Sequence, residues 1–178
     1  YEIDRRMMLD GCIYRGEERI FSDMALNDVV INRNGALRII DFDIYVNGEY
    51  LNTYSADGVI VSTATGSTAY SLSAGGPIIQ PTARLIMVTP ICPHSLNQRS
   101  IIFAADDELM IEMKDNKSSS GRMTGSLKND SARVATFDGE SFCEVVTGDR
   151  IVITQSKRIS RFVKTSRISF LERIRNKM

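Results

Sequence analysis

The sequence has few of the residues that usually reveal a site directly. Only three of its 178 residues are cysteines, Cys12, Cys92 and Cys143, and this odd number at wide spacings matches neither a disulfide framework nor a metal site. We therefore expect buried free thiols in a reducing compartment. The single histidine, His94, lies in the proline-containing segment 90–96 with no identifiable serine or cysteine partner, so we expect a structural role for it.

Neither charge predominates, and no apolar stretch is long. Lysine plus arginine and aspartate plus glutamate both number 22, so the chain lacks the field that draws proteins to nucleic acids or anionic membranes. The longest apolar stretches, such as 85–91, fall far short of the roughly 20 residues that span a bilayer, and no signal peptide opens the chain. The sequence predicts a cytoplasmic protein with no nucleic-acid or membrane partner.

The length and the first residues bear on domain organisation. A chain of 178 residues can form a single domain that buries roughly 70% of its unfolded surface. It begins Tyr1-Glu2-Ile3-Asp4, without a methionine and with the alternation of a strand. We interpret residues 1–178 as one domain taken from a longer protein.

Many short strands separated by turn residues are predicted. The clearest hairpin lies in 37–51, where Asn47-Gly48 separates two alternating stretches, because both central residues of a type I′ turn need positive φ. Helices are predicted at 68–74 and around Phe170, Leu171 and Ile174, an exposed loop at 114–121, and further strands at 2–9, 25–31, 59–63, 84–88, 100–104, 108–113, 133–137, 141–146 and 150–154. The predicted fold class is all-β, with two packed, mainly antiparallel sheets in a β-sandwich-like arrangement and these two helices.

The segment from Asp57 to Gly76 is the most unusual part of the sequence. A buried strand leads directly into a cluster of glycine and hydroxyl residues, Thr65-Gly66-Ser67-Thr68, that opens a short helix. Glycine lets the backbone approach a ligand closely, hydroxyls donate and accept hydrogen bonds, and a helix N-terminus favours negative charge. The segment is typical of a site for a sugar or a phosphate-bearing ligand.

This segment also has a plainer interpretation, and it does not match the common nucleotide motifs. Ser67 or Thr68 could merely cap the helix, and Gly75-Gly76 could merely end it. No lysine follows Gly66, which excludes a Walker loop. Neither Gly-x-Gly-x-x-Gly nor Gly-x-Ser-x-Gly occurs, so the dinucleotide fingerprint and the α/β-hydrolase elbow are absent.

A second candidate site is Ala25-Leu26-Asn27-Asp28-Val29-Val30, where two adjacent polar residues interrupt an otherwise apolar strand. The amide of Asn27 both donates and accepts, and the carboxylate of Asp28 accepts from hydroxyls, which suits an adenine edge and a ribose. An Asx turn at a strand end is the alternative. Asp10-Gly11 and Asp138-Gly139 are most simply turns.

In their order along the chain, these segments resemble the motifs of the NAD kinases, also called ATP or polyphosphate NAD kinases. Residues 25–28 resemble the family's Asn-Glu motif, and 57–76 its long Gly/Ser/Thr motif. Residues 89–96 are similar to its Pro-His-x-Leu segment, and Phe137-Asp138-Gly139 to its late Asp-Gly strand end. The likeness covers nearly the whole chain and implies the C-terminal, NAD-binding domain of such an enzyme.

The resemblance implies phosphoryl transfer from ATP, with Mg²⁺ as the divalent metal, to the 2′-hydroxyl of the adenosine ribose of NAD, which gives NADP. The NAD-binding residues that it implies are Asn27 and Asp28 for the adenosine part, Thr65, Thr68 and Ala69 for the adenine pocket, and Asp57, Tyr70 and Ser73 for the nicotinamide end. In bacterial relatives a loop similar to 90–96 helps to complete a neighbouring subunit's site. The resemblance therefore implies a homo-oligomer, either a dimer or a tetramer.

The chain departs from the family pattern at two places. Asp28 stands where the family has glutamate, so its side chain is one methylene shorter. The family's Gly-Gly-Asp-Gly motif, whose aspartate is taken to activate the attacking hydroxyl, occurs nowhere in the chain and belongs to an N-terminal α/β half. Phosphoryl transfer depends on a carboxylate that orients the nucleophile and on a divalent metal. We therefore expect no catalytic residue, no metal site and no kinase activity in this chain without its own N-terminal domain.

Two other functions are kept as alternatives. The corresponding half of a related lipid kinase would share the architecture but lack the combination of Asn-Asp with Gly-Ser-Thr-Ala-Tyr. A non-catalytic β-sandwich interaction module would use the hydroxyl-rich segment only as a capped turn. Binding of NADP but not of lipid would separate these possibilities.

Overall fold

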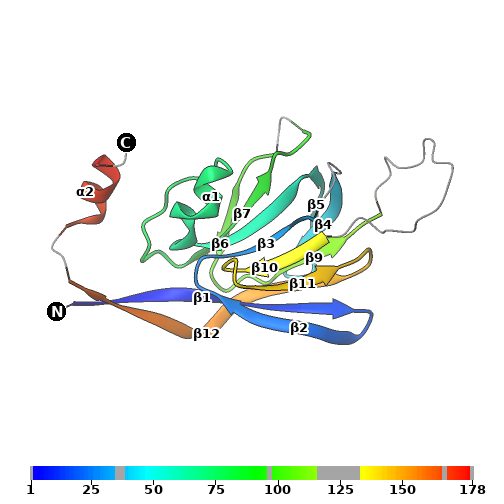
Figure 1. The fold of residues 1–178 in the computed structure, drawn as a ribbon, viewed down its shortest axis with the longest axis horizontal. Helices are drawn as coiled ribbons and strands as arrows, with labels where there is room; N and C mark the ends of the chain where they lie inside the picture. Colours follow the sequence, from blue (N-terminus) through cyan, green and yellow to red (C-terminus); the bar gives the residue numbers. More distant parts are fainter. Residues whose placement is uncertain (1, 35–38, 96–97, 116–132, 166–167, 177–178) are drawn as a thin grey trace.

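The computed structural model describes residues 2–34, 39–95, 98–115, 133–165 and 168–176. Its strands are β1 (Glu2–Arg15), β2 (Glu18–Ala25), β3 (Asp28–Arg33), β4 (Ile40–Val46), β5 (Glu49–Ala56), β6 (Gly58–Thr63), β7 (Leu85–Ile91), β8 (Ile101–Ala104), β9 (Leu109–Met113), β10 (Arg133–Phe137), β11 (Ser141–Val145) and β12 (Arg150–Lys164). They form two antiparallel six-stranded sheets, sheet A in the order β2-β1-β12-β9-β4-β5 and sheet B in the order β11-β10-β3-β6-β7-β8 (Figure 1). The all-β prediction is confirmed.

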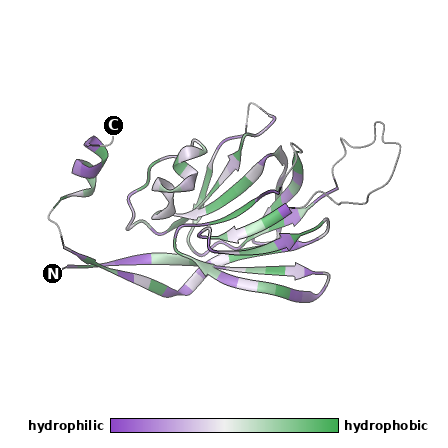
Figure 2. Cartoon of the chain, in the orientation of Figure 1, coloured by the Kyte–Doolittle hydropathy of each residue, from purple (hydrophilic) through white to green (hydrophobic). Residues whose placement is uncertain are grey.

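The hydrophobic core lies between the two sheets and is built from alternate residues of their strands. Along β1, Leu9 and Ile13 are fully buried, whereas Cys12 beside them is only half-buried. Along β2, by contrast, apolar and polar residues come in pairs, Ile20-Phe21, Ser22-Asp23 and Met24-Ala25. Hydrophobic and hydrophilic patches therefore follow one another along this edge of sheet A (Figure 2). The largest fully buried side chains are Phe42, Phe137, Leu9, Ile13, Ile31, Ile40, Ile44, Ile60, Ile86, Met87, Leu109 and Ile111.

The helical segments are short. A 3-10 turn, η1 (Gly66–Thr68), leads into α1 (Tyr70–Ser73), and α2 (Phe170–Arg175) lies near the C-terminus. The predicted helix at 68–74 is thus divided in two, and the C-terminal helix is confirmed. A hydrogen bond of 3.2 Å between the hydroxyls of Ser71 in α1 and Thr89 in β7 holds α1 against sheet B. None of the described helices is long and apolar enough to cross a membrane.

Turn chemistry predicts two connections correctly. Asn47 and Gly48 have φ values of 51° and 81° and join β4 to β5. Asp138 and Gly139, with φ values of 50° and 72°, join β10 to β11. Positive φ at both central positions is what a tight hairpin requires.

The prediction of a turn at Asp10-Gly11 is wrong, because both residues lie inside β1 and pair with β12 on one side and β2 on the other. The glycine serves packing between the sheets. A Cβ at Gly11 would lie 2.4 Å from Cε1 of the buried Phe137 ring.

The predicted strand 25–31 is also wrong at its start. β2 ends at Ala25 and β3 begins at Asp28, so Leu26 and Asn27 form a connection between two strands. β2 itself, Glu18–Ala25, was not among the predicted strands. The other predicted strands agree closely except that β1 and β12 are much longer.

The first residues of β1 pair with the last residues of β12, which extend beyond the predicted strand, and form a two-stranded ribbon that projects from sheet A toward α2 (Figure 1). Its register pairs Glu2 with Lys164 and Met7 with Ile159. The ammonium group of Lys164 lies 3.1 Å from the Glu2 carboxylate and 3.4 Å from that of Asp4. Apolar and charged residues share both faces of this ribbon, and residues 155–164 of β12 lack the simple alternation that predicts a half-buried strand.

Two smaller expectations need correction. The three cysteines are free, but none is buried: Cys92 is exposed, and Cys12 and Cys143 are half-buried. Cys12 faces outward from β1, and Cys92 follows β7 in a loop with a φ of 44°. The predicted loop 90–96 therefore begins two residues later than expected. Most of the predicted loop 114–121, and residue 96, lie outside the described residues.

Replacement of Gly11 by alanine should lower the free energy of unfolding by about 1–3 kcal/mol, because the new methyl group overpacks the core against Phe137. Urea denaturation of Gly11→Ala measures this. In a Phe137→Leu background, where the obstructing ring is gone, the same substitution should cost markedly less. An equal cost in both backgrounds would show that the ring is not the obstacle.

Candidate functional site

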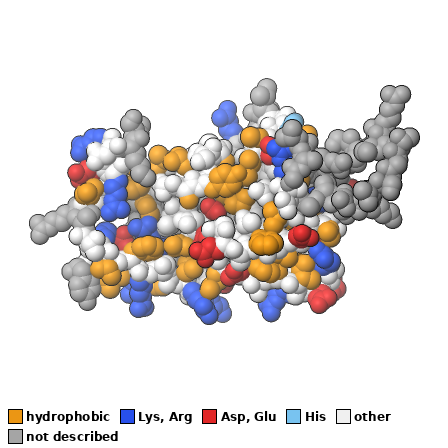
Figure 3. Space-filling model, viewed as in Figure 1, with side chains coloured by type: hydrophobic (Ala, Val, Ile, Leu, Met, Phe, Trp, Pro, Cys, Tyr) orange, Lys and Arg blue, Asp and Glu red, His pale blue; other side chains and the backbone are white. Residues whose placement is uncertain are grey.

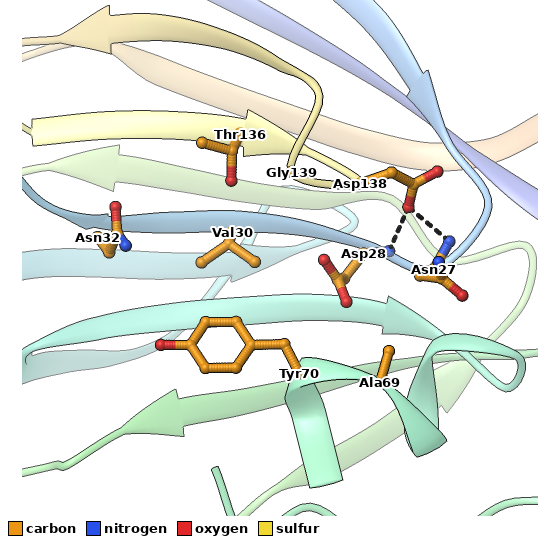
Figure 4. A pocket seen from close by; sticks show the side chains of 9 residues that line it. All are labelled: Asn27, Asp28, Val30, Asn32, Ala69, Tyr70, Thr136, Asp138 and Gly139. Carbon is orange, nitrogen blue, oxygen red and sulfur yellow. Dashed lines mark hydrogen bonds between the residues drawn. The ribbon is translucent and has the colours of Figure 1, made fainter. Parts of the chain in front are cut away.

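A cavity of about 340 Å³ lies on the outer face of sheet B, along β3. Residues alternate along β3, so Asp28, Val30 and Asn32 face the cavity while Val29 and Ile31 enter the core. The cavity is lined by Asn27, Asp28, Val30, Asn32, Ala69, Tyr70, Thr136, Asp138 and Gly139 (Figure 4). Figure 3 shows acidic side chains bordered by apolar ones near the middle of this face.

The carboxylate of Asp138 holds the connection between β2 and β3. It accepts the backbone N–H group of Leu26 at 2.7 Å. It also accepts those of Asn27 at 2.7 Å and Asp28 at 3.1 Å (Figure 4). The N–H of Asp138 in turn donates to the carbonyl of Asp28 at 3.0 Å. Three donors that would otherwise lack partners are thus satisfied by one charged acceptor, which fixes the backbone of this connection.

The other side of the same connection is held by the segment that follows β6. The hydroxyl of Thr63 donates to the carbonyl of Leu26 at 2.6 Å, and the N–H of Thr63 donates to that of Asn27 at 2.9 Å. A Cβ at Gly66 would lie only 2.1 Å from the Asn27 carbonyl oxygen. The close approach that this glycine permits is therefore to the backbone of Asn27, and it locks the two motifs together.

The hydroxyls of η1 and α1 support the turn rather than cap it. Ser67 Oγ donates to the carbonyl of Ala64 at 2.8 Å and accepts the N–H of Ile79 at 3.0 Å. Neither η1 nor α1 has a side-chain cap hydrogen bond. The interpretation of Ser67 or Thr68 as a helix cap is therefore wrong, whereas Gly75, with a φ of 86°, does end α1.

Asp28 is a buried carboxyl group with another carboxyl group close by. Only 5% of the surface of Asp28 is exposed to solvent. Burial, and then the negative charge of Asp138, raise the pKa of Asp28 to about 6. The side chains of Asn27 and Asp28 have no hydrogen bond to any described residue, so the Asx-turn alternative is not supported and both groups face the cavity.

The structure brings together only part of the predicted site. Of the eight predicted residues, Asn27, Asp28, Ala69 and Tyr70 line the cavity. The other four lie outside it: Asp57 pairs with Arg33 at 3.2 Å, Thr65 accepts from Arg6 at 3.4 Å, Thr68 donates to the Thr65 carbonyl, and Ser73 is exposed at the end of α1.

Five lining residues were not among the predicted binding residues, although three of them lie in segments that the sequence analysis singled out. The five are Val30, Asn32, Thr136, Asp138 and Gly139. Val30 and Asn32 could have been found, because the period of a strand places them on the same face as Asp28. Thr136 lies opposite Val30 only through the pairing of β10 with β3, and no local sequence signal gives that pairing.

Within the described ranges, no group of three or more histidine, cysteine, aspartate or glutamate side chains could hold a metal ion. The backbone N–H of His94 donates to the backbone carbonyl of Ser55 at 3.0 Å.

Known sequences resemble the chain over most or all of its length. Residues 26–165 match the family described as ATP-NAD kinase C-terminal domain. The chain is 99% identical to an NAD kinase of Lachnospira eligens over all of its own length and 61% of that protein. It is 42% identical to an NAD kinase of Lachnoclostridium phytofermentans over 99% of this chain and 60% of that protein. The chain thus spans about three fifths of the length of these curated relatives.

Two solved structures share the fold. A yeast NADH kinase in complex with NADH matches with a TM-score of 0.75 and 30% identity, over 86% of this chain and 41% of that one. An NAD kinase from Archaeoglobus fulgidus in complex with ATP matches with a TM-score of 0.72 and 22% identity, over 98% of this chain and 58% of that one. At that identity the second likeness concerns the fold alone.

Replacing Asp138 by asparagine should lower the free energy of unfolding by at least about 2 kcal/mol, because three backbone donors lose a charged acceptor. Asparagine tolerates positive φ, so the turn itself is not strained. Urea denaturation at pH 5, where Asp28 is largely protonated, keeps relief of charge repulsion from offsetting the loss. The control is Asp106→Asn in an exposed turn. Equal stabilities of the two variants would argue against the role given to Asp138.

The contribution of Asp28 to the free energy of unfolding should fall as the pH rises from 4 to 7. The folded state keeps this proton up to about pH 6, whereas the unfolded chain releases it near 3.8. Between these values the folded state binds more protons than the unfolded chain, so rising pH favours unfolding, by about 3 kcal/mol at pH 7. Thermal or urea unfolding of the wild type and Asp28→Asn across this range tests it. Identical pH dependence in both proteins would contradict the assignment.

Proposed function

We propose that this chain, which belongs to the ATP-NAD kinase C-terminal domain family, is the NAD-binding half of an NAD kinase. In the intact enzyme a phosphoryl group passes from ATP to the 2′-hydroxyl of the adenosine ribose of NAD and gives NADP. The chain spans 61% of its 99% identical relative. We assign the residues that activate the hydroxyl and handle the phosphates of ATP to an N-terminal α/β half that carries Gly-Gly-Asp-Gly. The family match favours this function over a lipid kinase or a non-catalytic interaction module.

The observation that carries the proposal is the doubly held Asn27–Asp28 connection at one end of the cavity. Its backbone is fixed from both sides, while its two side chains keep their hydrogen-bonding groups free to face a ligand. The Asp28 carboxylate accepts from ribose hydroxyls, and the Asn27 amide pairs with an adenine edge. A cavity of about 340 Å³ lies within the usual size range of small-ligand sites, about 300–1,000 Å³.

In this proposal the chain contributes positioning rather than chemistry. A pre-fixed connection holds the adenosine ribose so that its 2′-hydroxyl meets the phosphoryl donor in a reproducible geometry. The aromatic face of Tyr70 offers a flat apolar surface for a ring of the ligand. ATP and Mg²⁺ are assigned to the other half, because the family resemblance places Gly-Gly-Asp-Gly there.

The remaining residues keep the roles that the family resemblance implies. Thr65 and Thr68 would border the adenine pocket, and Asp57 and Ser73 the nicotinamide end. The solved complex of a yeast NADH kinase with NADH supports a dinucleotide ligand for this fold. A cytoplasmic homo-oligomer, dimer or tetramer, completes the proposal.

The 178-residue chain should bind NAD and NADP weakly and should produce no NADP from NAD, ATP and Mg²⁺. Isothermal titration calorimetry measures the binding, and an enzymatic assay for NADP measures turnover. Asp28→Asn, which removes an acceptor for ribose hydroxyls, should weaken binding by roughly tenfold. Asp106→Asn, remote from the cavity, is the matched control and should bind as the wild type does. Turnover by the chain alone, or unchanged binding by Asp28→Asn, would count against the proposal.

A further inference from the structure

Ser62 lies near the end of β6 and takes no part in the hydrogen bonds that hold the Asn27–Asp28 connection. Val59 and Val61 of the same strand enter the core, so the alternation of the strand turns Ser62 to the outer face of sheet B. The residue is nevertheless fully buried, and its hydroxyl has no hydrogen-bond partner among the described residues. Buried hydroxyl groups are nearly always hydrogen-bonded, so this exception needs a physical explanation.

Asp28 is the residue directly opposite Ser62 on the neighbouring strand. The N–H of Thr63 donates to the carbonyl of Asn27 at 2.9 Å, which makes these two residues a hydrogen-bonded pair of the antiparallel ladder. Asp28 and Ser62 form the next pair, which is not hydrogen-bonded through the backbone. Side chains of such a pair share one face of the sheet, with Cβ atoms about 4.5–5.5 Å apart. A serine hydroxyl and a carboxyl group at this separation are within reach of each other.

The surroundings offer neither side chain a better partner. Met87 of β7, which lies opposite Ser62 on its other side, has only a thioether, and this is a weak acceptor. Asp138 and Tyr70 are the titratable side chains that line the cavity with Asp28, and no described lining residue is cationic. Figure 4 shows the carboxyl group of Asp28 on the side of β3 that faces β6. A donor without an acceptor thus lies beside an acceptor without a donor.

We propose that Ser62 is a positioning residue for Asp28, whose hydroxyl donates to one carboxylate oxygen and leaves the other oxygen for the ligand. The two groups are not bonded in the structure, but serine needs only a rotation about its Cα–Cβ bond to exchange one staggered position for another. The inference rests on the proposed function in what the free oxygen binds, a ribose hydroxyl. A donor to the carboxylate also favours the ionised form of Asp28, which is the form that accepts from such hydroxyls.

Titration of Asp28 in the ligand-free chain tests the hydrogen bond without any assumption about function. The ¹³C chemical shift of the Asp28 carboxyl group, assigned with the help of Asp28→Asn, is followed by NMR between pH 4 and pH 8. Ser62→Ala removes a donor from the ionised form, so the pKa of Asp28 should rise and the midpoint should move to a higher pH. Ser62→Cys, with a side chain of similar shape and a weak donor, should move the midpoint in the same direction.

Ser71→Ala is the matched control for an effect on the fold. It removes another fully buried hydroxyl of the segment 57–76, one that is bonded to Thr89 and not to the cavity wall. This variant should unfold at a lower urea concentration than the wild type but keep the same midpoint for Asp28. A purely structural role of Ser62 would make the variants at positions 62 and 71 behave alike.

NAD binding, measured by isothermal titration calorimetry, tests the consequence for the ligand. At pH 7 Ser62→Ala should bind NAD about fivefold more weakly than the wild type, because less Asp28 is ionised and its carboxylate is less well oriented. The loss should become smaller at pH 9, where Asp28 is ionised with or without the hydroxyl of Ser62. Ser71→Ala should show no such dependence of the loss on pH.

An unchanged or lower midpoint in Ser62→Ala overturns the inference. So does an equal rise in Ser71→Ala, because the shift would then come from a loosened fold. Equal binding of NAD by Ser62→Ala and the wild type at pH 7 overturns the role given to the second oxygen. If the wild type binds no NAD while Ser62→Ala still raises the midpoint, the proposed function fails and the hydrogen bond between Ser62 and Asp28 stands.

Discussion

The arrangement of the cavity depends on one carboxylate that accepts three consecutive backbone N–H groups. Asp138 lies 110 residues from Asp28 in the sequence, yet it fixes the connection that presents Asn27 and Asp28. Because the acceptor is charged and the donors are successive, the connection cannot rotate without leaving several groups unpaired. Thr63 and Gly66 hold the opposite side of the same connection. The two sequence motifs of the site are therefore one structural unit, and the turn between β10 and β11 holds the first motif from its other side.

The same unit contains an unfavourable interaction between two neighbouring carboxyl groups. The Asp138 charge that holds the connection also raises the pKa of Asp28, because two carboxylates share a poorly solvated region. The burial of two neighbouring carboxyl groups therefore makes the folded state less stable than it could be, and a ligand that donates hydrogen bonds to Asp28 would offset part of this cost. Such local departures from optimal stability are typical of binding sites.

Patterns that depend on neighbouring residues could be predicted from the sequence, and those that depend on distant ones could not. The Asn47-Gly48 hairpin follows from backbone preference alone, and four residues that the family resemblance named, Asn27, Asp28, Ala69 and Tyr70, line the same cavity. The role of Asp138 was not predictable, because its turn is a local property but its three hydrogen bonds arise from the pairing of β10 with β3. Gly11 and Gly66 misled for the same reason: each looks like a turn or ligand glycine, whereas each accommodates an atom from a distant part of the chain.

The ribbon formed by β1 and β12 gives the molecule a direction of mechanical weakness. Glu2 is paired with Lys164, so the outer ends of the two strands lie side by side. A force that pulls these two ends apart would act on one residue pair at a time, so the backbone hydrogen bonds between β1 and β12 would break one after another. A force along the strands would instead be shared by all pairs of the ladder. Since β1 and β12 are neighbours within sheet A, unzipping would part β1 and β2 from the other four strands, and this seam is where a pulled molecule would first divide.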